Sequence, residues 1–122
     1  MIDRNLDRLD VIDEMIRLLR GRLTGLSLAS LMADRDEQDL TAYRLAVIGE
    51  ATNKLTPALR DHYPTIAWAA MYRMRNIIIH DYPGIDVMRV FETATTQLDA
   101  LSAMVREELR DAPSPGSPAA SP

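Results

Sequence analysis

The side chains best suited to chemistry in this 122-residue chain lie together between positions 75 and 82. Arg75 supplies a fixed positive charge, Asn76 an amide, His80 an imidazole that titrates near neutral pH, and Tyr82 a phenol. The chain has only two histidines and no cysteine. If the protein carries out acid–base catalysis near neutral pH, His80 is therefore the leading candidate for the group that moves the proton.

A helix over about 65–80 is expected to carry this run. Thr65 is a plausible N-cap, and Pro83 disfavours helical geometry at the residue before it. With about 100° of rotation per residue, three faces result. The core face has Ile66, Ala70, Met74, Ile77 and Ile78, the polar face has Ala69, Arg73, Asn76 and His80, and the face between them has Trp68, Tyr72, Arg75 and Ile79.

The spacing of Arg75 and His80 limits how the two side chains could act on the same group. The two side chains lie roughly 140° apart on a straight helix, so they do not converge well. They converge if the helix frays at its end, or if two copies of the chain meet across a two-fold axis. Arg75 also shares its face with two aromatic residues and an isoleucine, which is the composition of an interface core. We therefore expect a second chain against this face.

Two local effects are expected near the end of this helix. Asn76 and His80 are spaced i, i+4, so their side chains can touch. His80 lies in the last turn, where the helix dipole favours the cationic form of the imidazole.

The remaining helices are expected over about 2–23, 35–56 and 86–109, with a short helical turn over 27–34. The first has one apolar stripe, formed by Ile2, Leu6, Leu9, Ile12, Ile16, Leu19 and Leu23. The second has two stripes, formed by Leu40, Tyr43, Val47, Ala51 and Leu55 and by Leu45, Ile48 and Thr52. The last, capped by Asp86, is expected to turn Met88, Phe91, Thr95, Leu98, Met104 and Val105 inward.

The predicted fold is an all-α antiparallel bundle of four main helices plus the short helical turn. Gly49 inside the second main helix costs up to about 1 kcal/mol relative to alanine. A close helix crossing or a partner chain would explain it. Residues 1–110 are expected to form one domain, and the Pro-, Ser- and Ala-rich segment 111–122 is expected to be a disordered tail.

Composition narrows the possible functions. The formal net charge of −4 argues against broad, non-specific coating of nucleic acid, but it leaves room for a small basic site. The absence of cysteine excludes disulfides and thiolate metal sites and fits a cytoplasmic protein. The start of the chain lacks the pattern of a signal peptide, and no apolar run is long enough to span a membrane.

The same residues also have a purely structural interpretation. A histidine or an arginine near the end of a helix often serves only as a cap or as a partner of the dipole. A tyrosine before a proline often only packs, and a tryptophan more often belongs to a core than to a site. Their spacing alone does not decide between the two interpretations.

The chain as a whole resembles the HepT-like (DUF86) branch of the HEPN superfamily over roughly residues 2–110. The resemblance rests on Val47-Ile48-Gly49-Glu50-Ala51, on Tyr63-Pro64 through Trp68, on Met74-Arg75-Asn76 through His80-Asp81-Tyr82, and on Ile85-Asp86. It includes the family motif R-x4-H-x-Y without departure. It implies a homodimer in which the Arg and His motifs of both chains meet, with metal-independent endoribonuclease activity and no cofactor.

The resemblance also implies a role for each motif residue. His80 would take the proton from a ribose 2′-hydroxyl or donate one to the leaving oxygen, and Arg75 would bind the scissile phosphate and stabilise its developing charge. Asn76 would orient His80 or the phosphate. Tyr82 would contact RNA and accept AMP from a neighbouring minimal nucleotidyltransferase, the antitoxin of a toxin–antitoxin pair. Tyr63 and Tyr72 are other phenols in the chain.

Three further residues have roles that the motif does not define. Arg73 and Arg89 are candidates to extend a small phosphate track. Glu50 lies within the resemblance but stays outside the catalytic set, because a glutamate buried in a helix is equally a structural hydrogen-bond partner.

Three functions remain open from the sequence. The first is the ribonuclease toxin, cleaving tRNA or mRNA, with no membrane or DNA partner. The second is a non-catalytic helical module that binds a minimal nucleotidyltransferase or is its substrate. The third is a plain dimeric bundle whose polar residues are caps.

Overall fold

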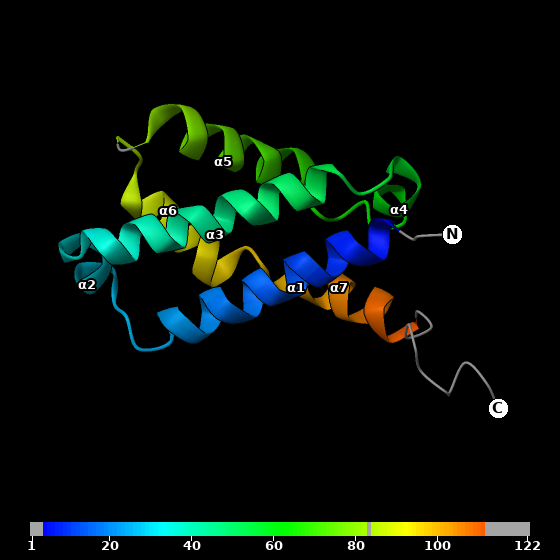
Figure 1. Ribbon diagram of the computed structural model, residues 1–122, viewed down its shortest axis with the longest axis horizontal. Coiled ribbons are helices and arrows are strands. Elements are labelled where there is room, and N and C mark those ends of the chain that lie inside the picture. Colours follow the sequence, from blue (N-terminus) through cyan, green and yellow to red (C-terminus); the bar gives the residue numbers. More distant parts are fainter. Residues whose placement is uncertain (1–3, 83, 112–122) are drawn as a thin grey trace.

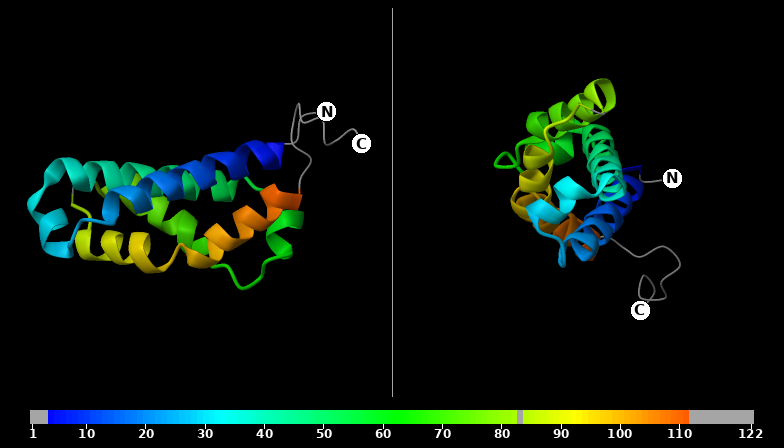
Figure 2. Two further views of the ribbon diagram at one scale, coloured as in Figure 1. Left: turned by 90° about the horizontal axis from the view of Figure 1, so that it is seen from below. Right: turned by 90° about the vertical axis from the view of Figure 1, so that its left-hand side faces the viewer.

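The computed structural model describes residues 4–82 and 84–111, and this part of the chain consists of α-helices joined by turns and loops, without strands. Three long helices, α1 (Arg4–Leu23), α3 (Arg35–Asn53) and α5 (Trp68–Asp81), lie side by side, with α3 in the middle. The helices α6 (Val87–Thr96) and α7 (Asp99–Asp111) close the other side of the bundle (Figures 1 and 2). The short helices α2 (Leu28–Ala33) and α4 (Pro57–Asp61) lie at opposite ends.

The predicted all-α bundle is confirmed, and α1, α2 and α5 lie close to their expected ranges. Ile2 and the tail beyond Asp111 fall outside the described residues. The predicted stripe of α1 is buried at Leu9, Ile12, Ile16, Leu19 and Leu23. Both stripes of α3 contribute to the core, but Tyr43 is 64% exposed. The core therefore fills the space between α1, α3, α5 and the pair α6–α7.

The prediction of one helix over 86–109 was wrong, because the segment breaks at Gln97 and Leu98. The turn before the break is rich in threonine, and the hydroxyls of Thr95 and Thr96 donate hydrogen bonds to carbonyls one turn back. Such bonds and β-branching weaken a helix. The break leaves Leu98 fully buried and starts α7 at Asp99, whose carboxylate pairs with Arg20.

The face of α6 was also predicted wrongly. Val90, Thr93 and Ala94 are buried, whereas Met88 is 55% exposed and Thr95 is exposed. The sequence prediction assumed one continuous stripe from Met88 to Val105, and the break at Gln97 changes the rotation between the two halves. Leu98, Met104 and Val105 are buried as predicted.

The start of α5 and the end of α3 differ from prediction too. The N-cap of α5 is Ala67, which makes no side-chain cap bond, and Thr65 lies exposed in the preceding turn. The indole of Trp68 instead donates to the carbonyl of Tyr63 and ties the first turn of α5 to that loop. α3 ends at Asn53, and Thr56 caps the extra helix α4, whose Pro57 suits the first turn of a helix.

Candidate functional site

The close crossing of α3 and α5 positions Arg75. At Gly49 of α3, an added Cβ atom would lie 2.6 Å from Cβ of Arg75 and 2.8 Å from the backbone oxygen of Met71. Only glycine therefore lets the two backbones come this close. The close helix crossing that Gly49 suggested is confirmed, and it seats the guanidinium of Arg75 beside the next residue of α3, Glu50.

Arg75 is held by three neighbours. Its Nε lies 2.9 Å from Oε2 of Glu50, its Nη1 donates to Oδ1 of Asn76 at 2.8 Å, and its guanidinium carbon lies 5.5 Å from the centre of the Tyr72 ring. Both Nε and Oε2 are buried, yet neither makes a hydrogen bond. The contact with Glu50 is therefore an ion pair whose N–H is not aimed at the oxygen, and the guanidinium is placed without all of its donors being used.

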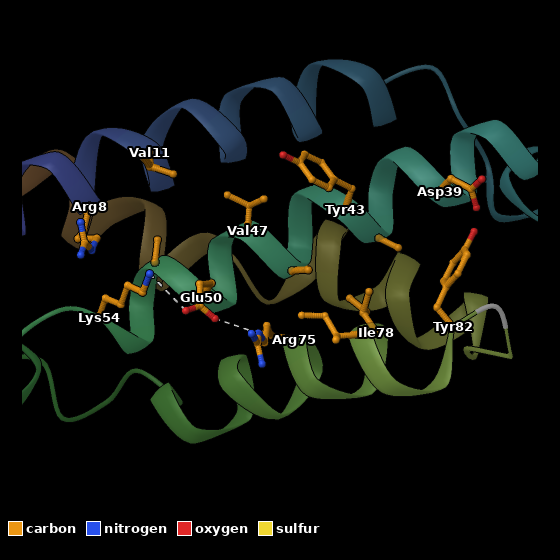
Figure 3. Close-up of a pocket in the computed structure, with 14 residues that line it drawn as sticks. Arg8, Val11, Asp39, Tyr43, Val47, Glu50, Lys54, Arg75, Ile78 and Tyr82 are labelled. Atoms are coloured by element: carbon orange, nitrogen blue, oxygen red, sulfur yellow. Dashed lines mark ion pairs between the residues drawn. The ribbon is translucent and has the colours of Figure 1, made fainter.

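Arg75 faces a groove of about 640 Å³ between α1, α3 and α5. Figure 3 shows Arg8 and Lys54 at one end, with Glu50 and Arg75 next to them, and Asp39 and Tyr82 at the other end. The wall between the two ends is apolar apart from Tyr43, and it includes Val11, Ala42, Ala46, Val47, Ile78 and Ile79. The groove therefore offers charged groups at both ends of an apolar surface.

His80 lies outside this groove. It is exposed in the last turn of α5, and no hydrogen bond or ion pair to another described residue holds it. α5 stays helical to Asp81, so the helix end does not fray and bring His80 to Arg75. Asn76 accepts from Arg75 and makes no contact of this kind with His80. One chain therefore fixes the arginine but leaves the histidine apart from it.

Tyr82 caps the C-terminal end of α5 and reaches back to the start of α3. Its hydroxyl oxygen accepts a hydrogen bond from Nε of Arg35 at 3.1 Å, and the Arg35 guanidinium lies 5.2 Å from the centre of the Tyr82 ring. Arg35 is itself paired with Asp39 one turn along α3, at 3.0 Å. The phenol is thus held at the groove end opposite Arg8 and Lys54.

Comparison with known proteins assigns the chain to a family. The profile of the family described as "Ribonuclease HepT-like" matches residues 12–108. The chain belongs to the HepT-like ribonuclease family. The match contains Gly49, Glu50, Arg75, His80 and Tyr82.

Individual relatives agree with this membership. A "Probable ribonuclease HepT" of Thermococcus cleftensis is 30% identical over 104 residues, which cover 85% of this chain and 94% of the relative. A "Putative RNase" of Caldanaerobacter subterraneus subsp. tengcongensis is 26% identical over 102 residues, 84% of this chain and 91% of the relative. A "Putative RNase" of Methanocaldococcus jannaschii is 34% identical over 67 residues, 55% of this chain and 58% of the relative. No solved structure gave a significant match.

Membership supports ribonuclease activity at the level of the family. Within residues 4–82 and 84–111, no helix is both long and apolar enough to cross a membrane. The same residues contain no group of three His, Cys, Asp or Glu side chains arranged to hold a metal ion. Metal independence stays a prediction of the HepT-like resemblance.

Arg73 and Arg89 do not extend the groove that contains Arg75. Both line a second groove of about 530 Å³ between α5, α6 and α7, together with Glu92. The two grooves lie on different sides of α5, because they share no lining residue. The predicted phosphate track would therefore have to pass around α5 to join the two sites.

Of the three other phenols, Tyr43 is 64% exposed and lines the same groove as Tyr82, whereas Tyr63 and Tyr72 are half-buried. The Tyr63 hydroxyl donates to the carboxylates of Glu108 and Glu107, and these bonds, together with burial and the negative charges, raise the pKa of Tyr63 well above its ordinary value. Tyr63 therefore ties the loop before α5 to α7. Tyr72 is half-buried beneath the Arg75 guanidinium.

Sequence reasoning left four residues out of the candidate site that the structure places in it or next to it. Glu50 on α3 and the C-cap residue Lys54 are spaced i, i+4 and form an ion pair at 3.4 Å, which the spacing alone could have suggested. Arg8 and Arg35 carried no such signal. They reach the groove or Tyr82 from helices that are distant in sequence.

Proposed function

We propose that this HepT-like protein is the toxin of a toxin–antitoxin pair and acts as a metal-independent endoribonuclease on tRNA or mRNA. In this proposal it works as a homodimer, and a partner nucleotidyltransferase inactivates it by transferring AMP to Tyr82. The observation that carries the proposal is the placement of Arg75. A half-buried arginine is fixed beside a groove by Gly49, Glu50 and Asn76, and a histidine lies five residues further on at the end of the same helix.

The chemistry that suits these groups is internal transfer of the phosphodiester. The ribose 2′-oxygen attacks the phosphorus, the bond to the 5′-oxygen breaks, and the products carry a 2′,3′-cyclic phosphate and a 5′-hydroxyl. The imidazole of His80 takes the 2′-hydroxyl proton or protonates the departing 5′-oxygen. Arg75 donates to the non-bridging oxygens, whose negative charge grows in the transition state.

The separation of Arg75 and His80 within one chain supports the dimeric part of the proposal. The groove beside Arg75 includes apolar side chains that are exposed in the single chain, namely Val11 at 39%, Ile79 at 51% and Tyr43 at 64%. A second copy seated on this apolar wall would remove its area from water, while the charged ends of the groove would stay open to RNA. It would also bring its own His80 toward the Arg75 of the first chain.

The position of Tyr82 supports regulation through this residue. Transfer of AMP joins the phenol oxygen to the α-phosphorus of ATP, releases pyrophosphate and removes the phenol proton. The product adds a negative phosphodiester and a nucleoside at the end of the groove that Arg75 also lines. Bulk and negative charge there would compete with RNA phosphate for the groove.

A second candidate function is a non-catalytic partner and substrate of the nucleotidyltransferase. It is favoured by the contrast between Tyr82, which Arg35 holds, and His80, which no hydrogen bond or ion pair holds among the described residues. A protein of this kind would need the phenol and not the imidazole.

A nuclease assay separates the two functions. Purified wild-type protein in EDTA is expected to cleave tRNA or mRNA and to leave 2′,3′-cyclic phosphate ends, and His80→Ala is expected to abolish this cleavage. Fully retained cleavage by His80→Ala would overturn the catalytic proposal. Absence of cleavage by the wild type, with AMP transfer to Tyr82 intact, would establish the non-catalytic alternative.

A further inference from the structure

Three cations from separate parts of the chain gather at one end of the groove. Arg8 of α1, Lys54 at the C-cap of α3 and Arg75 of α5 all line it there, and Glu50 lies among them (Figure 3). Three positive charges against one carboxylate leave this end positive, although the chain as a whole has a formal charge of −4. Such a local excess attracts anions.

Glu50 does not use up the donors of these cations. Its contact with Lys54 is an ion pair at 3.4 Å between side chains that are both at least one-third exposed, so the ammonium group is free to move toward a ligand. Its contact with Arg75 at 2.9 Å is not an aligned hydrogen bond. One carboxylate thus holds two cations in place and leaves most of their N–H groups unused.

Arg8 is the most unusual of the three cations. It forms no ion pair with any described residue, whereas Arg17, Arg20 and Arg22 further along α1 each have a carboxylate partner. The Nε atom of Arg8 is buried and lacks a hydrogen-bond partner. A half-buried guanidinium without a partner is costly, and a bound anion would offset that cost.

We propose that Arg8 and Lys54 bind an RNA phosphate next to the one at Arg75, and that Glu50 positions both Lys54 and Arg75 for this purpose. The inference rests on the proposed ribonuclease function and extends its substrate contacts. A nucleic-acid backbone presents successive phosphates, and cations at separate points along a groove match that pattern. The cluster lies beyond Arg75 and away from Tyr82, so it would bind the strand on the side opposite the modification site.

Binding of a single-stranded 2′-O-methyl RNA oligonucleotide tests the proposal without cleavage, because its 2′-oxygens cannot attack. The full chain is titrated over a range of salt concentrations as wild type, Arg8→Ala, Lys54→Ala and Glu50→Gln. Arg17→Ala is the matched control, because Arg17 lies on the same helix but is paired with Asp13 and does not line the groove.

Arg8→Ala and Lys54→Ala are each expected to weaken RNA binding about fivefold. The control variant Arg17→Ala is expected to bind RNA as the wild type does. Arg8→Ala and Lys54→Ala are each also expected to lower the slope of log affinity against log salt by about 0.7, the value for one phosphate contact on a single strand. Glu50→Gln is expected to weaken binding without lowering that slope, because it removes no cation. Circular dichroism melting of each variant checks that the fold is kept.

Wild-type affinity and salt slope in both Arg8→Ala and Lys54→Ala would overturn the inference, even if the enzyme cleaves RNA. The inference would also fail if sedimentation showed that these variants no longer dimerise while their RNA affinity stayed unchanged. In that case the anion bound by Arg8 and Lys54 would be a carboxylate of the partner chain. A parallel ATP titration distinguishes the phosphate source, because loss of ATP binding with unchanged RNA binding would assign the cluster to free nucleotide. RNA binding without cleavage by the wild type would overturn the nuclease proposal and leave this inference standing.

Discussion

Two arginine–glutamate pairs join α3 to its neighbours, and they differ in what they leave unused. Arg22 of α1 donates to both oxygens of Glu37 through aligned hydrogen bonds, with Nε at 2.8 Å and 3.0 Å. Arg75 of α5 contacts Glu50 as an ion pair without such alignment. The first pair satisfies its own groups and serves the fold. The second holds a guanidinium in place and leaves donors unused.

The largest expected effect comes from truncating the arginine of each pair, Arg75 or Arg22, to alanine. Arg75→Ala is expected to lower the cleavage rate about 10²- to 10³-fold, because it removes a donor to the transition-state phosphate. Arg22→Ala is expected to lower the urea midpoint of unfolding and to leave cleavage by the folded protein unchanged. Rates measured at saturating RNA, together with urea melts of both variants, check this. Equal cleavage by the two variants would remove the distinction between the pairs.

The crossing at Gly49 gives the next largest effect. Gly49→Ala is expected to destabilise the protein by about 1–3 kcal/mol, because the new Cβ collides with Cβ of Arg75 and the Met71 carbonyl. Gly21→Ala on α1 is the control, since nothing lies within 4 Å of a Cβ there, and it is expected to stabilise the helix by up to about 1 kcal/mol. Urea unfolding compares the two. If Gly49→Ala stabilised the protein, the close packing of α3 against α5 at Arg75 would be contradicted.

Neutralising each glutamate sharpens the comparison further. Glu50→Gln is expected to reduce cleavage about tenfold, through a misplaced Arg75, with little loss of stability. Glu37→Gln is expected to show the reverse, a lower unfolding midpoint with normal cleavage. Cleavage assays and urea melts run on the same preparations check this. A stability loss in Glu50→Gln as large as in Glu37→Gln would make the second pair structural as well.

The smallest expected effect is a change of stability with pH, and it involves only the Arg22–Glu37 pair. The hydrogen bond from Arg22 and its positive charge lower the pKa of Glu37 below its ordinary value, against the opposing effect of burial. A lowered pKa means that this contribution to stability is present above about pH 4.5 and is lost as the pH falls through the folded-state pKa. Wild type is therefore expected to lose more stability than Glu37→Gln between pH 5 and pH 3 in urea melts. Parallel curves would contradict the assignment.

Much of the fold could be predicted from periodicity and capping. The stripe of α1, the short helix near 27–34 and the end of α5 before Pro83 all followed from local sequence. The break at Gln97 could not, because it depends on burying Leu98 in a core that residues distant in sequence supply. The N-cap of α5 was misplaced for a similar reason, since Trp68 is held by a backbone oxygen of a loop that sequence alone does not position.

The candidate site was predictable only where its residues share a helix. Arg75, Asn76, His80 and Tyr82 were singled out by their residue types and by the resemblance to the HepT-like motif, and Gly49 by its cost within a helix. Arg75 and His80 stay on different sides of α5, and its regular helical end removes fraying as a way to bring them together. Arg8 and Arg35 were missed because only the packing of α1 and α3 brings them to the groove and to Tyr82.

The central claim is that a complete site needs the arginine of one chain and the histidine of another. Mixing Arg75→Ala with His80→Ala, after brief denaturation and refolding to form mixed dimers, tests it most directly. Each variant alone is expected to cleave at least about 10²-fold more slowly than wild type. The mixture is expected to recover metal-independent cleavage, since each mixed dimer retains one Arg75 and one His80 on opposite chains. A mixture that forms mixed dimers by native mass spectrometry and still cleaves no RNA would contradict the claim.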